Sequence, residues 1–419
     1  MLSVQAAEEI ILNSVQPLDN QIDTEIVNLT WAARRILATS VTSELDFPHW
    51  DNSAMDGYAV LYQDVQNCSN EQPAILSIVT EIPAGGIPEI SLQPGQAARI
   101  LTGAMMPGGA DTVIMQERTR REGDRLFILA PPETLGAFVR RRASFYQAGN
   151  PLLESGIILN APEIAILAAA QRPQLTVYRR PRVAILSTGD ELVTPEQPLQ
   201  PGQIVDSNQY ALAALVAQTG AIPEMLGIIP DHPSKIEQAI AQAVANADMV
   251  LSTGGVSVGD YDYVAEILGK LGAEISITSV AVKPGKPLTV ANFPNPKTGR
   301  SVLYFGLPGN PVSSLVSFWR FVQPALKKLA GLKTGWQPQF VQAQSAVTLR
   351  GNGNLETYFW GKLQLIDGTY QFHPAGGSHS SGNLINLAQT NGLAVIPVGQ
   401  TTILPGEIVQ ILVGIGEYI

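Results

Sequence analysis

The most restrictive feature of this sequence is a repeated alternation of apolar runs and helical stretches between residues 178 and 332. The β-branched runs VAILSTG, MVLSTGG and VLYFGLPG each lead through a glycine-containing loop into a segment with helical spacing. Strand, loop and helix repeated at these lengths predict a doubly wound, parallel α/β domain over residues 178–332, with helices on both faces of its sheet. Ligands bind outside the carboxyl ends of the strands in such sheets, so these loops are the first candidates for chemistry.

The chain changes character on both sides of this region, which indicates a multidomain α/β plus all-β protein. Residues 1–46 and 146–177 read as a helical N-terminal or linker domain, including a helix over about 26–38. Between them, residues 47–145 alternate short β-prone runs with Pro and Gly turns, which predicts an inserted β domain. Residues 333–419 have the same punctuated β character and predict a C-terminal β-barrel domain.

Composition narrows the possible functions. The net charge of −10 and the pI near 5.0 disfavour nucleic-acid binding, because an acidic field repels phosphate backbones. A local basic cluster, YRRPR at 178–182, has a solvated linker face as its simplest interpretation. Cys68 is the single cysteine, so we expect no disulfide and a reducing, cytoplasmic location. No apolar run of about 18 residues and no signal-peptide pattern occurs, so we expect no membrane association.

Three loops after apolar strands share an unusual content of glycine and small polar residues: STGDEL (187–192), STGGVSVGDYDY (252–263) and GLPGNPVSS (306–314). Glycine allows close backbone approach to a ligand, and N–H groups at a helix start favour phosphate. One such loop is weak evidence, because it can equally be a turn or a helix cap. Three on successive strands predict one shared anion-binding crevice.

Charged residues make up only 15% of the chain, so those beside these loops carry information. In VAVKPGKPL (280–288), prolines stiffen the backbone around Lys283 and Lys286, whose ammonium groups suit an oxyanion or polyphosphate, although two solvated lysines are the simpler alternative. Carboxylates near bound phosphates commonly hold Mg²⁺, and the candidates here are Glu191, Asp231, Asp260 and Asp262. The four histidines are dispersed, which disfavours a site for a softer metal.

Six segments in order resemble the molybdopterin molybdenumtransferases of the MoeA type, which are similar to the corresponding domain of gephyrin. They are the three loops, the VAVKPGKPL segment, and two segments of the inserted domain, DNSAMDGYAV (51–60) and RILTGAMMPGGADTVIMQE (99–117). The resemblance covers nearly the whole chain. It implies an elongated homodimer of four-domain subunits, whose α/β domain is similar to molybdopterin adenylyltransferase.

The resemblance also implies a reaction. Adenylylated molybdopterin and molybdate would be the substrates, with Mg²⁺ or a similar divalent ion, and the products would be molybdenum cofactor and AMP. An adenylyltransferase-type enzyme would act upstream, and molybdoenzymes would be the acceptors. The cleft would lie between the α/β domain of one subunit and the inserted domain of the other, into which Asp56 and Thr102 would reach.

Positions that match the family carry over residue by residue. The polar catalytic positions are Asp56, Thr102, Glu191, Asp231 and Asp262, of which the last three would also bind the metal. The substrate-binding positions are Ser252, Thr253, Gly254, Gly255, Ser257, Gly259, Lys283, Lys286, Pro287, Pro308, Gly309, Asn310, Pro311, Ser313 and Ser380, with Ser381 as the alternative to Ser380.

Two positions depart from the family pattern. Phe145 in RRRASFY (140–146) stands where an aspartate is expected, and Trp360 in TYFWGKL (357–363) stands where an arginine commonly helps hold the oxyanion. We interpret both as lineage variation, because the segments of the α/β cleft are intact. A non-catalytic molybdopterin-binding scaffold and an enzyme of the adenylylating step remain as alternative functions.

Overall fold

The computed structural model of the protein describes residues 1–254, 263–294 and 299–415. The chain divides into two compact units, and the second of them consists of Ser40–Glu154 and Ala165–Arg172. The first unit holds the rest of the chain: Met1–Thr39, Ser155–Ile164 and Pro173–Ile419. None of the helices in the described ranges is long and apolar enough to cross a membrane.

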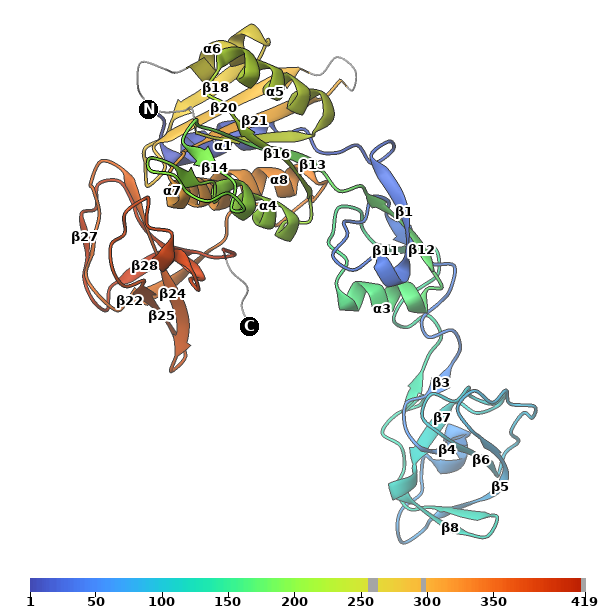
Figure 1. The fold of residues 1–419 in the computed structure, drawn as a ribbon. Helices are drawn as coiled ribbons and strands as arrows, with labels where there is room; N and C mark the ends of the chain where they lie inside the picture. Colours follow the sequence, from blue (N-terminus) through green and yellow to red (C-terminus); the bar gives the residue numbers. More distant parts are fainter. Residues whose placement is uncertain (255–262, 295–298, 416–419) are drawn as a thin grey trace. The chain divides into compact units, whose positions relative to one another are not determined.

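A six-stranded sheet forms the centre of the first unit, in the order β16-β13-β17-β21-β20-β18 (Figure 1). Its strands are β13 (Arg182–Thr188), β16 (Ile222–Ile229), β17 (Met249–Thr253), β18 (Glu274–Ser279), β20 (Pro287–Pro294) and β21 (Ser301–Leu307). The strands β16, β13, β17 and β21 are parallel, as predicted. The edge differs from the prediction, because β20 runs antiparallel to both β18 and β21. No helix separates β18 from β20, and a short connection returns the chain in the opposite direction.

Helices cover both faces of this sheet, because successive apolar side chains along each strand point to opposite faces and both faces must be buried. Val183 and Ile185 of β13 point into one core, whereas Ala184 and Leu186 point into the other. The first core is covered by α1 (Val4–Ser14), α4 (Asn208–Gln218), α7 (Pro311–Ser317) and α8 (Gln323–Leu329), and the second by α5 (Pro233–Asn246) and α6 (Tyr263–Lys270) (Figure 1). The doubly wound α/β fold is therefore confirmed.

The prediction of a helix over about 26–38 was wrong. These residues form the strand β1 (Thr24–Asn28) and a short 3₁₀ turn (Leu29–Trp31), and β1 pairs antiparallel with β12 (Gln174–Tyr178). The segment TEIVN suits a strand, but its partner lies far away in the sequence. Local spacing of apolar residues could not reveal that pairing.

The second unit contains the inserted β domain, as predicted. Its sheet has the order β7-β4-β6-β5-β9-β8. The strands are β4 (Gly57–Val60), β5 (Ala74–Ile82), β6 (Gln96–Ile100), β7 (Thr112–Met115), β8 (Thr119–Glu122) and β9 (Arg125–Ile128). Ala59 and Ala98 of neighbouring strands pack into one core of this unit, and Tyr58 and Ala97 pack into another.

The predicted C-terminal barrel is confirmed. The strands β24, β25, β22, β28 and β26 are hydrogen-bonded in that order, and the pairing of β24 with β26 closes the ring. They are β22 (Phe340–Ser345), β24 (Glu356–Ile366), β25 (Thr369–Pro374), β26 (Gly392–Ile396) and β28 (Ile408–Leu412). A short strand, β19 (Val282–Lys283), joins β24 in parallel. This pairing attaches the lysine segment to the barrel.

Candidate functional site

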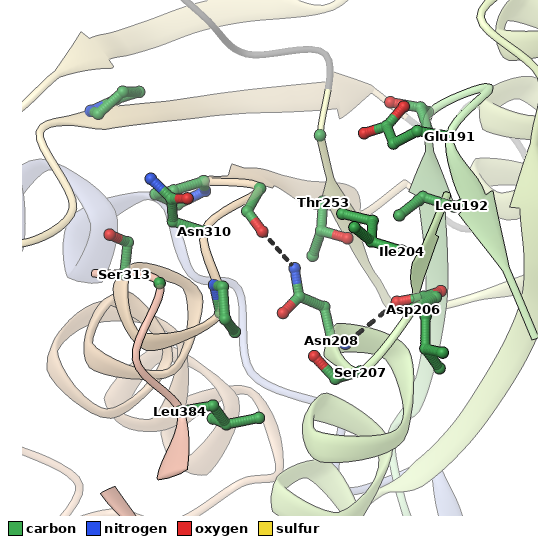
Figure 2. A pocket seen from close by; sticks show the side chains of 18 of the residues that line it. Glu191, Leu192, Ile204, Asp206, Ser207, Asn208, Thr253, Asn310, Ser313 and Leu384 are labelled. Carbon is green, nitrogen blue, oxygen red and sulfur yellow. Dashed lines mark hydrogen bonds between the residues drawn. The ribbon is translucent and has the colours of Figure 1, made fainter. Parts of the chain in front are cut away.

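A pocket of about 750 Å³ lies at the carboxyl ends of the parallel strands (Figure 2). Thr188 ends β13 and Glu191 follows it, Thr253 ends β17 and Gly254 follows it, and the segment Pro308–Pro311 follows β21; all of them line the pocket. Because β13, β17 and β21 are neighbours in the sheet, their carboxyl ends meet at one edge. The three glycine-bearing loops therefore contribute to a single cavity, within the residues described.

Gly254 is required for the first two loops to approach each other. Its φ is +87°, and a Cβ atom at this position would lie 2.2 Å from the carbonyl oxygen of Thr188. No other residue adopts this backbone conformation at such a distance without displacing β13. The third loop is held close by a hydrogen bond of 2.8 Å from the Asn208 side-chain amide to the Gly309 carbonyl oxygen.

The start of α4 forms a wall of the pocket that the sequence analysis missed. Asp206, Ser207 and Asn208 all line the cavity (Figure 2). The buried Asp206 accepts hydrogen bonds from the backbone N–H groups of Asn208 and Gln209 at 3.0 and 3.3 Å, and so caps the helix. The Asp-Ser pair before the helical run was the signal that could have located this wall. The apolar Leu192, Ile204 and Leu384, which also line it, carried no such signal.

Two buried polar atoms of residues that line the pocket lack hydrogen-bond partners among the described residues. The Asn208 Oδ1 and the Thr188 Oγ1 are buried, and neither forms a hydrogen bond with any residue described in the structure. A buried polar group left unsatisfied costs on the order of 1–3 kcal/mol, and native proteins contain few of them. Because both residues line the pocket, a bound polar ligand is the natural partner for these atoms.

One end of the pocket is acidic. This acidic end consists of Glu191, which lines the pocket, together with the adjacent Asp190 and with Asp231, which follows β16; the two aspartates lie beside Glu191 but do not line the pocket. The Asp231 N–H donates a 3.0 Å hydrogen bond to Asp190 Oδ1. Partial burial and the negative charges of Asp190 and Glu191 raise the pKa of Asp231 above its ordinary value of 3.8. The residues described contain no group of three carboxylate, histidine or cysteine ligands placed to hold a metal ion by themselves.

The other end is basic and continues into an adjoining pocket of about 690 Å³. The two pockets share Pro287, Asn310 and Ser313 as lining residues, so we call them the joined pocket. Its basic end consists of Lys283, Lys286 and Arg350. None of these three makes an ion pair with a residue in the described part of the chain. Arg350 was not predicted, because nothing in its local sequence marks it.

The barrel supplies the outer wall of the basic end. Ser380 and Ser381 both line it, and the Ser381 carbonyl oxygen accepts a 3.1 Å hydrogen bond from the N–H of Val312 at the start of α7. This bond ties the barrel loop to the third glycine-bearing loop. The serines and the lysines therefore face the same cavity.

Some predicted residues lie elsewhere. Ser252 does not line the joined pocket; it is buried in the sheet, and its hydroxyl is hydrogen-bonded to that of Tyr304. Gly255, Ser257, Gly259 and Asp262 fall outside the described residues.

Asp56 and Thr102 belong to the second unit. The hydroxyl and the backbone N–H of Thr102 each donate a 2.7 Å hydrogen bond to Asp56 Oδ1. These two bonds lower the pKa of the exposed Asp56 carboxyl. Asp51, in the same segment, is instead bound by Arg141 and by the Arg142 N–H, at 2.7 Å each. Asp51 therefore holds the backbone of its own domain, whereas Asp56 presents an ionised carboxylate to solvent.

Three family profiles match the chain in order. They are described as the MoeA N-terminal region, domains I and II (residues 2–170), a probable molybdopterin binding domain (184–328), and the MoeA C-terminal region, domain IV (342–413). A molybdopterin molybdenumtransferase of Nostoc sp. is 63% identical over 98% of this chain and 94% of its own length. The chain belongs to the molybdopterin molybdenumtransferase family.

Other relatives support the same family assignment. The molybdopterin molybdenumtransferase of Synechococcus elongatus is 33% identical over 98% of this chain and 99% of its own length. The crystal structure of a molybdopterin biosynthesis MoeA protein from Pyrococcus horikoshii OT3 superposes with a TM-score of 0.83 at 28% identity, covering 99% of this chain and 100% of that one. This chain is therefore a transferase of molybdenum-cofactor biosynthesis.

The two departures from the family pattern have different environments. Trp360 is fully buried, donates a 2.9 Å hydrogen bond from Nε1 to Asn386 Oδ1, and packs against the His379 ring with 4.4 Å between centroids. The Asn386 amide in turn holds the carbonyl oxygens of Gly376 and Ser378. Trp360 thus positions the loop that carries Ser380. Phe145, in contrast, is 71% exposed.

Proposed function

We propose that the protein inserts molybdenum from molybdate into adenylylated molybdopterin, forming molybdenum cofactor and releasing AMP with the help of Mg²⁺. The observation that carries this proposal is the joined pocket, with carboxylates at one end and unpaired ammonium groups at the other. A ligand bearing phosphates needs cations around it, and an incoming oxyanion needs more of them. The relatives named molybdopterin molybdenumtransferase support the same chemistry.

The volume and the walls of the joined pocket suit a substrate with a ring system and a phosphoanhydride. Pockets for small ligands typically measure 300–1,000 Å³, and the two parts measure about 750 and 690 Å³. We assign the ring system to the apolar residues Leu192, Ile204 and Leu384. The phosphates would approach the backbone at Gly254, where the absence of a side chain leaves room for them.

We assign molybdate to the basic end. Lys283 and Lys286 would neutralise its charge, while the hydroxyls of Ser313 and Ser380 would donate hydrogen bonds to its oxygens. Cleavage of the phosphoanhydride accumulates negative charge on the departing phosphate. Fixed cations at this end stabilise that charge more in the transition state than in the ground state.

The acidic end fits a magnesium ion that the substrate helps to hold. Mg²⁺ is commonly bound through one or two carboxylates together with phosphate oxygens and water. Glu191 and Asp231 are the carboxylates available, and the raised pKa of Asp231 reports a negative charge that lacks compensation. The ion, when bound, would neutralise phosphate charge. Asp262 was assigned to the same ion from the sequence.

Asp56 and Thr102 enter the proposal as residues supplied by the second subunit of a homodimer. Thr102 keeps the Asp56 carboxylate ionised and fixed in orientation, and both residues are exposed. Because both side chains are exposed, we assign this pair to interaction with a substrate. We further propose a cytoplasmic location, an adenylyltransferase-type enzyme as donor, and molybdoenzymes as acceptors.

Measuring AMP release from purified protein and adenylylated molybdopterin tests the proposal. Release should rise with molybdate and require Mg²⁺. Binding of the pterin without release at any molybdate concentration would favour the scaffold alternative. Formation of adenylylated pterin from ATP would favour an enzyme of the adenylylating step.

A mixing experiment tests the shared cleft. Asp56→Asn homodimers should be inactive, and Lys286→Gln homodimers should be nearly inactive at molybdate concentrations far below their raised KM. At the same molybdate concentration, heterodimers reconstituted from the two variants should recover activity at the one cleft that carries neither change. Heterodimers without activity would contradict a cleft built from two subunits. Heterodimers formed from Asp56→Asn and wild-type chains provide the control for subunit exchange.

A further inference from the structure

A second cavity of about 470 Å³ lies in the first unit, remote in the fold from the strand ends that line the joined pocket. We call it the linker pocket, because the connections between β1, β12 and the sheet line it. Its cationic lining residues are Arg34, Arg35, Arg179, Arg180 and Lys327, and no described lining residue is acidic. Such a concentration of positive charge is unexpected in a chain with a net charge of −10.

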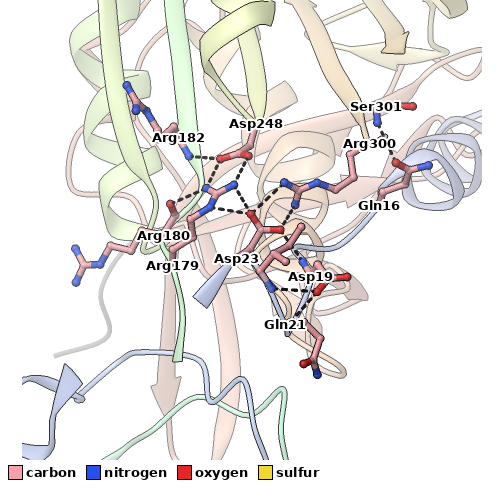
Figure 3. A network of polar contacts seen from close by, with 11 residues as sticks. Gln16, Asp19, Gln21, Asp23, Arg179, Arg180, Arg182, Asp248, Arg300 and Ser301 are labelled. Carbon is pink, nitrogen blue, oxygen red and sulfur yellow. Dashed lines mark hydrogen bonds and ion pairs between the residues drawn. The ribbon is translucent and has the colours of Figure 1, made fainter. Parts of the chain in front are cut away.

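The carboxylates that pair with two of these cations do not line the linker pocket. Arg179 makes a bidentate contact of 2.7 Å with Asp248 and also bonds Asp23 (Figure 3). Arg35 pairs with Glu25. All three carboxylates line a neighbouring cavity, which shares Arg179 and Arg180 with the linker pocket. These pairs fix the side chains of Arg35 and Arg179 without adding a carboxylate to the lining of the linker pocket.

The remaining three cations have no such partners. Arg34, Arg180 and Lys327 make no side-chain hydrogen bond or ion pair with residues in the described ranges, and Arg180 extends away from the network of Arg179 (Figure 3). Lys327 is half-buried, and burial lowers its pKa. Keeping an ammonium group partly out of water without a counter-charge is unfavourable, and a bound anion would offset that cost.

The backbone around Arg34 is also constrained. This residue has a φ of +61°, which side chains other than glycine rarely adopt. Its N–H donates a 2.8 Å hydrogen bond to Leu159, and the N–H of Leu159 donates a 2.9 Å bond to Arg35. Strained residues of this kind concentrate at ligand sites, where the surrounding structure fixes them. Here the two hydrogen bonds with Leu159 fix the backbone at Arg34, which lines the pocket.

Apolar residues complete the linker pocket. Ile36, Ile158 and Leu332 contribute side chains beside the cations, and Gln218 and Gln323 add amide groups. We propose that the linker pocket is a second binding site, separate from the joined pocket, for an organic phosphate with an apolar body. Arginine suits phosphate because its planar fork donates two parallel hydrogen bonds, and the isoleucines suit the rest of the molecule.

Phenyl phosphate and inorganic phosphate are the probes, measured by calorimetry in a Lys283→Gln/Lys286→Gln background that weakens the basic end of the joined pocket. Phenyl phosphate should bind about tenfold more tightly than inorganic phosphate, as about 1.4 kcal/mol of apolar burial implies. Lys327→Gln should weaken phenyl phosphate binding about tenfold. The matched control is Lys235→Gln on α5, an exposed lysine that lines neither pocket.

Equal losses in Lys327→Gln and Lys235→Gln would show a response to net charge only and would overturn the proposal. Equal binding of the two probes would overturn the assignment of an organic phosphate. In the otherwise unmodified protein, Lys327→Gln should leave AMP release unchanged, because the residue lies outside the joined pocket. AMP release and phenyl phosphate binding are therefore independent readouts. The protein can bind phenyl phosphate in the linker pocket without releasing AMP, and it can release AMP without binding phenyl phosphate there.

Discussion

The acidic and basic ends of the joined pocket differ in how the protein supports them. The acidic end lies on loops that directly follow β13 and β16, so the α/β sheet alone positions it. The basic end depends on the pairing of β19 with β24 and on the bond between Val312 and Ser381. One end is thus a property of a single sheet, whereas the other requires the barrel to be docked on that sheet.

The two ends also differ in charge balance. At the acidic end, partial burial and the charges of Asp190 and Glu191 oppose the ionisation of Asp231, and a cation would relieve the conflict. At the basic end, ammonium groups lack counter-charges among the described residues and would be completed by an anion. Under the proposed function, a cation would complete the acidic end and an anion the basic end, so each end can be perturbed separately.

We expect the largest effect from a substitution at Gly254, which disturbs the pocket between the acidic and basic ends and therefore affects both of them. Gly254→Ala should lower the free energy of unfolding by about 3 kcal/mol, since Cβ would meet the Thr188 carbonyl oxygen at a positive φ. Urea denaturation measures this change. Gly309→Ala is the control, because its Cβ would have its nearest contact at 3.7 Å and no positive φ is required. Equal stability of the two variants would contradict the argument.

A second change separates the ends. Lys286→Gln should raise the KM for molybdate about thirtyfold, which corresponds to about 2 kcal/mol for a hydrogen bond to a charged group, and should leave pterin affinity nearly unchanged. AMP release as a function of molybdate gives the KM. Lys362→Gln, an exposed lysine of the barrel outside both pockets, should behave as wild type. A weaker affinity for pterin at constant KM for molybdate would reverse the assignment of the two ends.

A third change tests the wall beside the acidic end. Asp206→Ala removes the cap of α4 and should cost about 1.5 kcal/mol of unfolding free energy. Ser207→Ala is a close control, because Ser207 makes no capping hydrogen bond with its side chain. Thermal or urea unfolding compares them. If Ser207→Ala is the more destabilising variant, Asp206 is not the cap that organises this wall.

The smallest expected effect is a shift in pH dependence. Because the pKa of Asp231 is raised in the folded protein, protons compete with Mg²⁺ for this carboxyl as the pH falls through its folded-state pKa. The raised pKa also contributes to stability below pH 3.8, the ordinary value, and this contribution is lost as the pH rises through the folded-state pKa. Asp190→Asn removes one cause of the shift but keeps an oxygen for the Asp231 N–H. The midpoint of Mg²⁺-induced thermal stabilisation should therefore move to lower pH. A midpoint that stays or rises would exclude coupling between Asp190 and Asp231.

Much of the architecture could be predicted from local patterns. Continuous apolar runs such as VAIL, each followed by a glycine-bearing loop and a helical segment, predicted the α/β domain, because a parallel strand buried on both faces must be apolar on both faces. The helix over 26–38 failed, because β1 is a strand only in the presence of β12. Asn208 and Arg350 were missed for a related reason: polar residues are common at helix starts and strand ends, and only folding brings these two to a cavity.

The sequence by itself determined the layered α/β core, the inserted β domain, the barrel and the loops that hold Glu191, Lys286 and Asn310, because periodicity and backbone constraints are encoded locally. The tertiary structure decided which of these groups face the same space. It buried Ser252 against Tyr304, gave Trp360 a supporting role under the serine loop, and left Lys327 without a counter-charge among the described residues. Such outcomes depend on contacts between residues far apart in the chain, whose energies no local pattern contains.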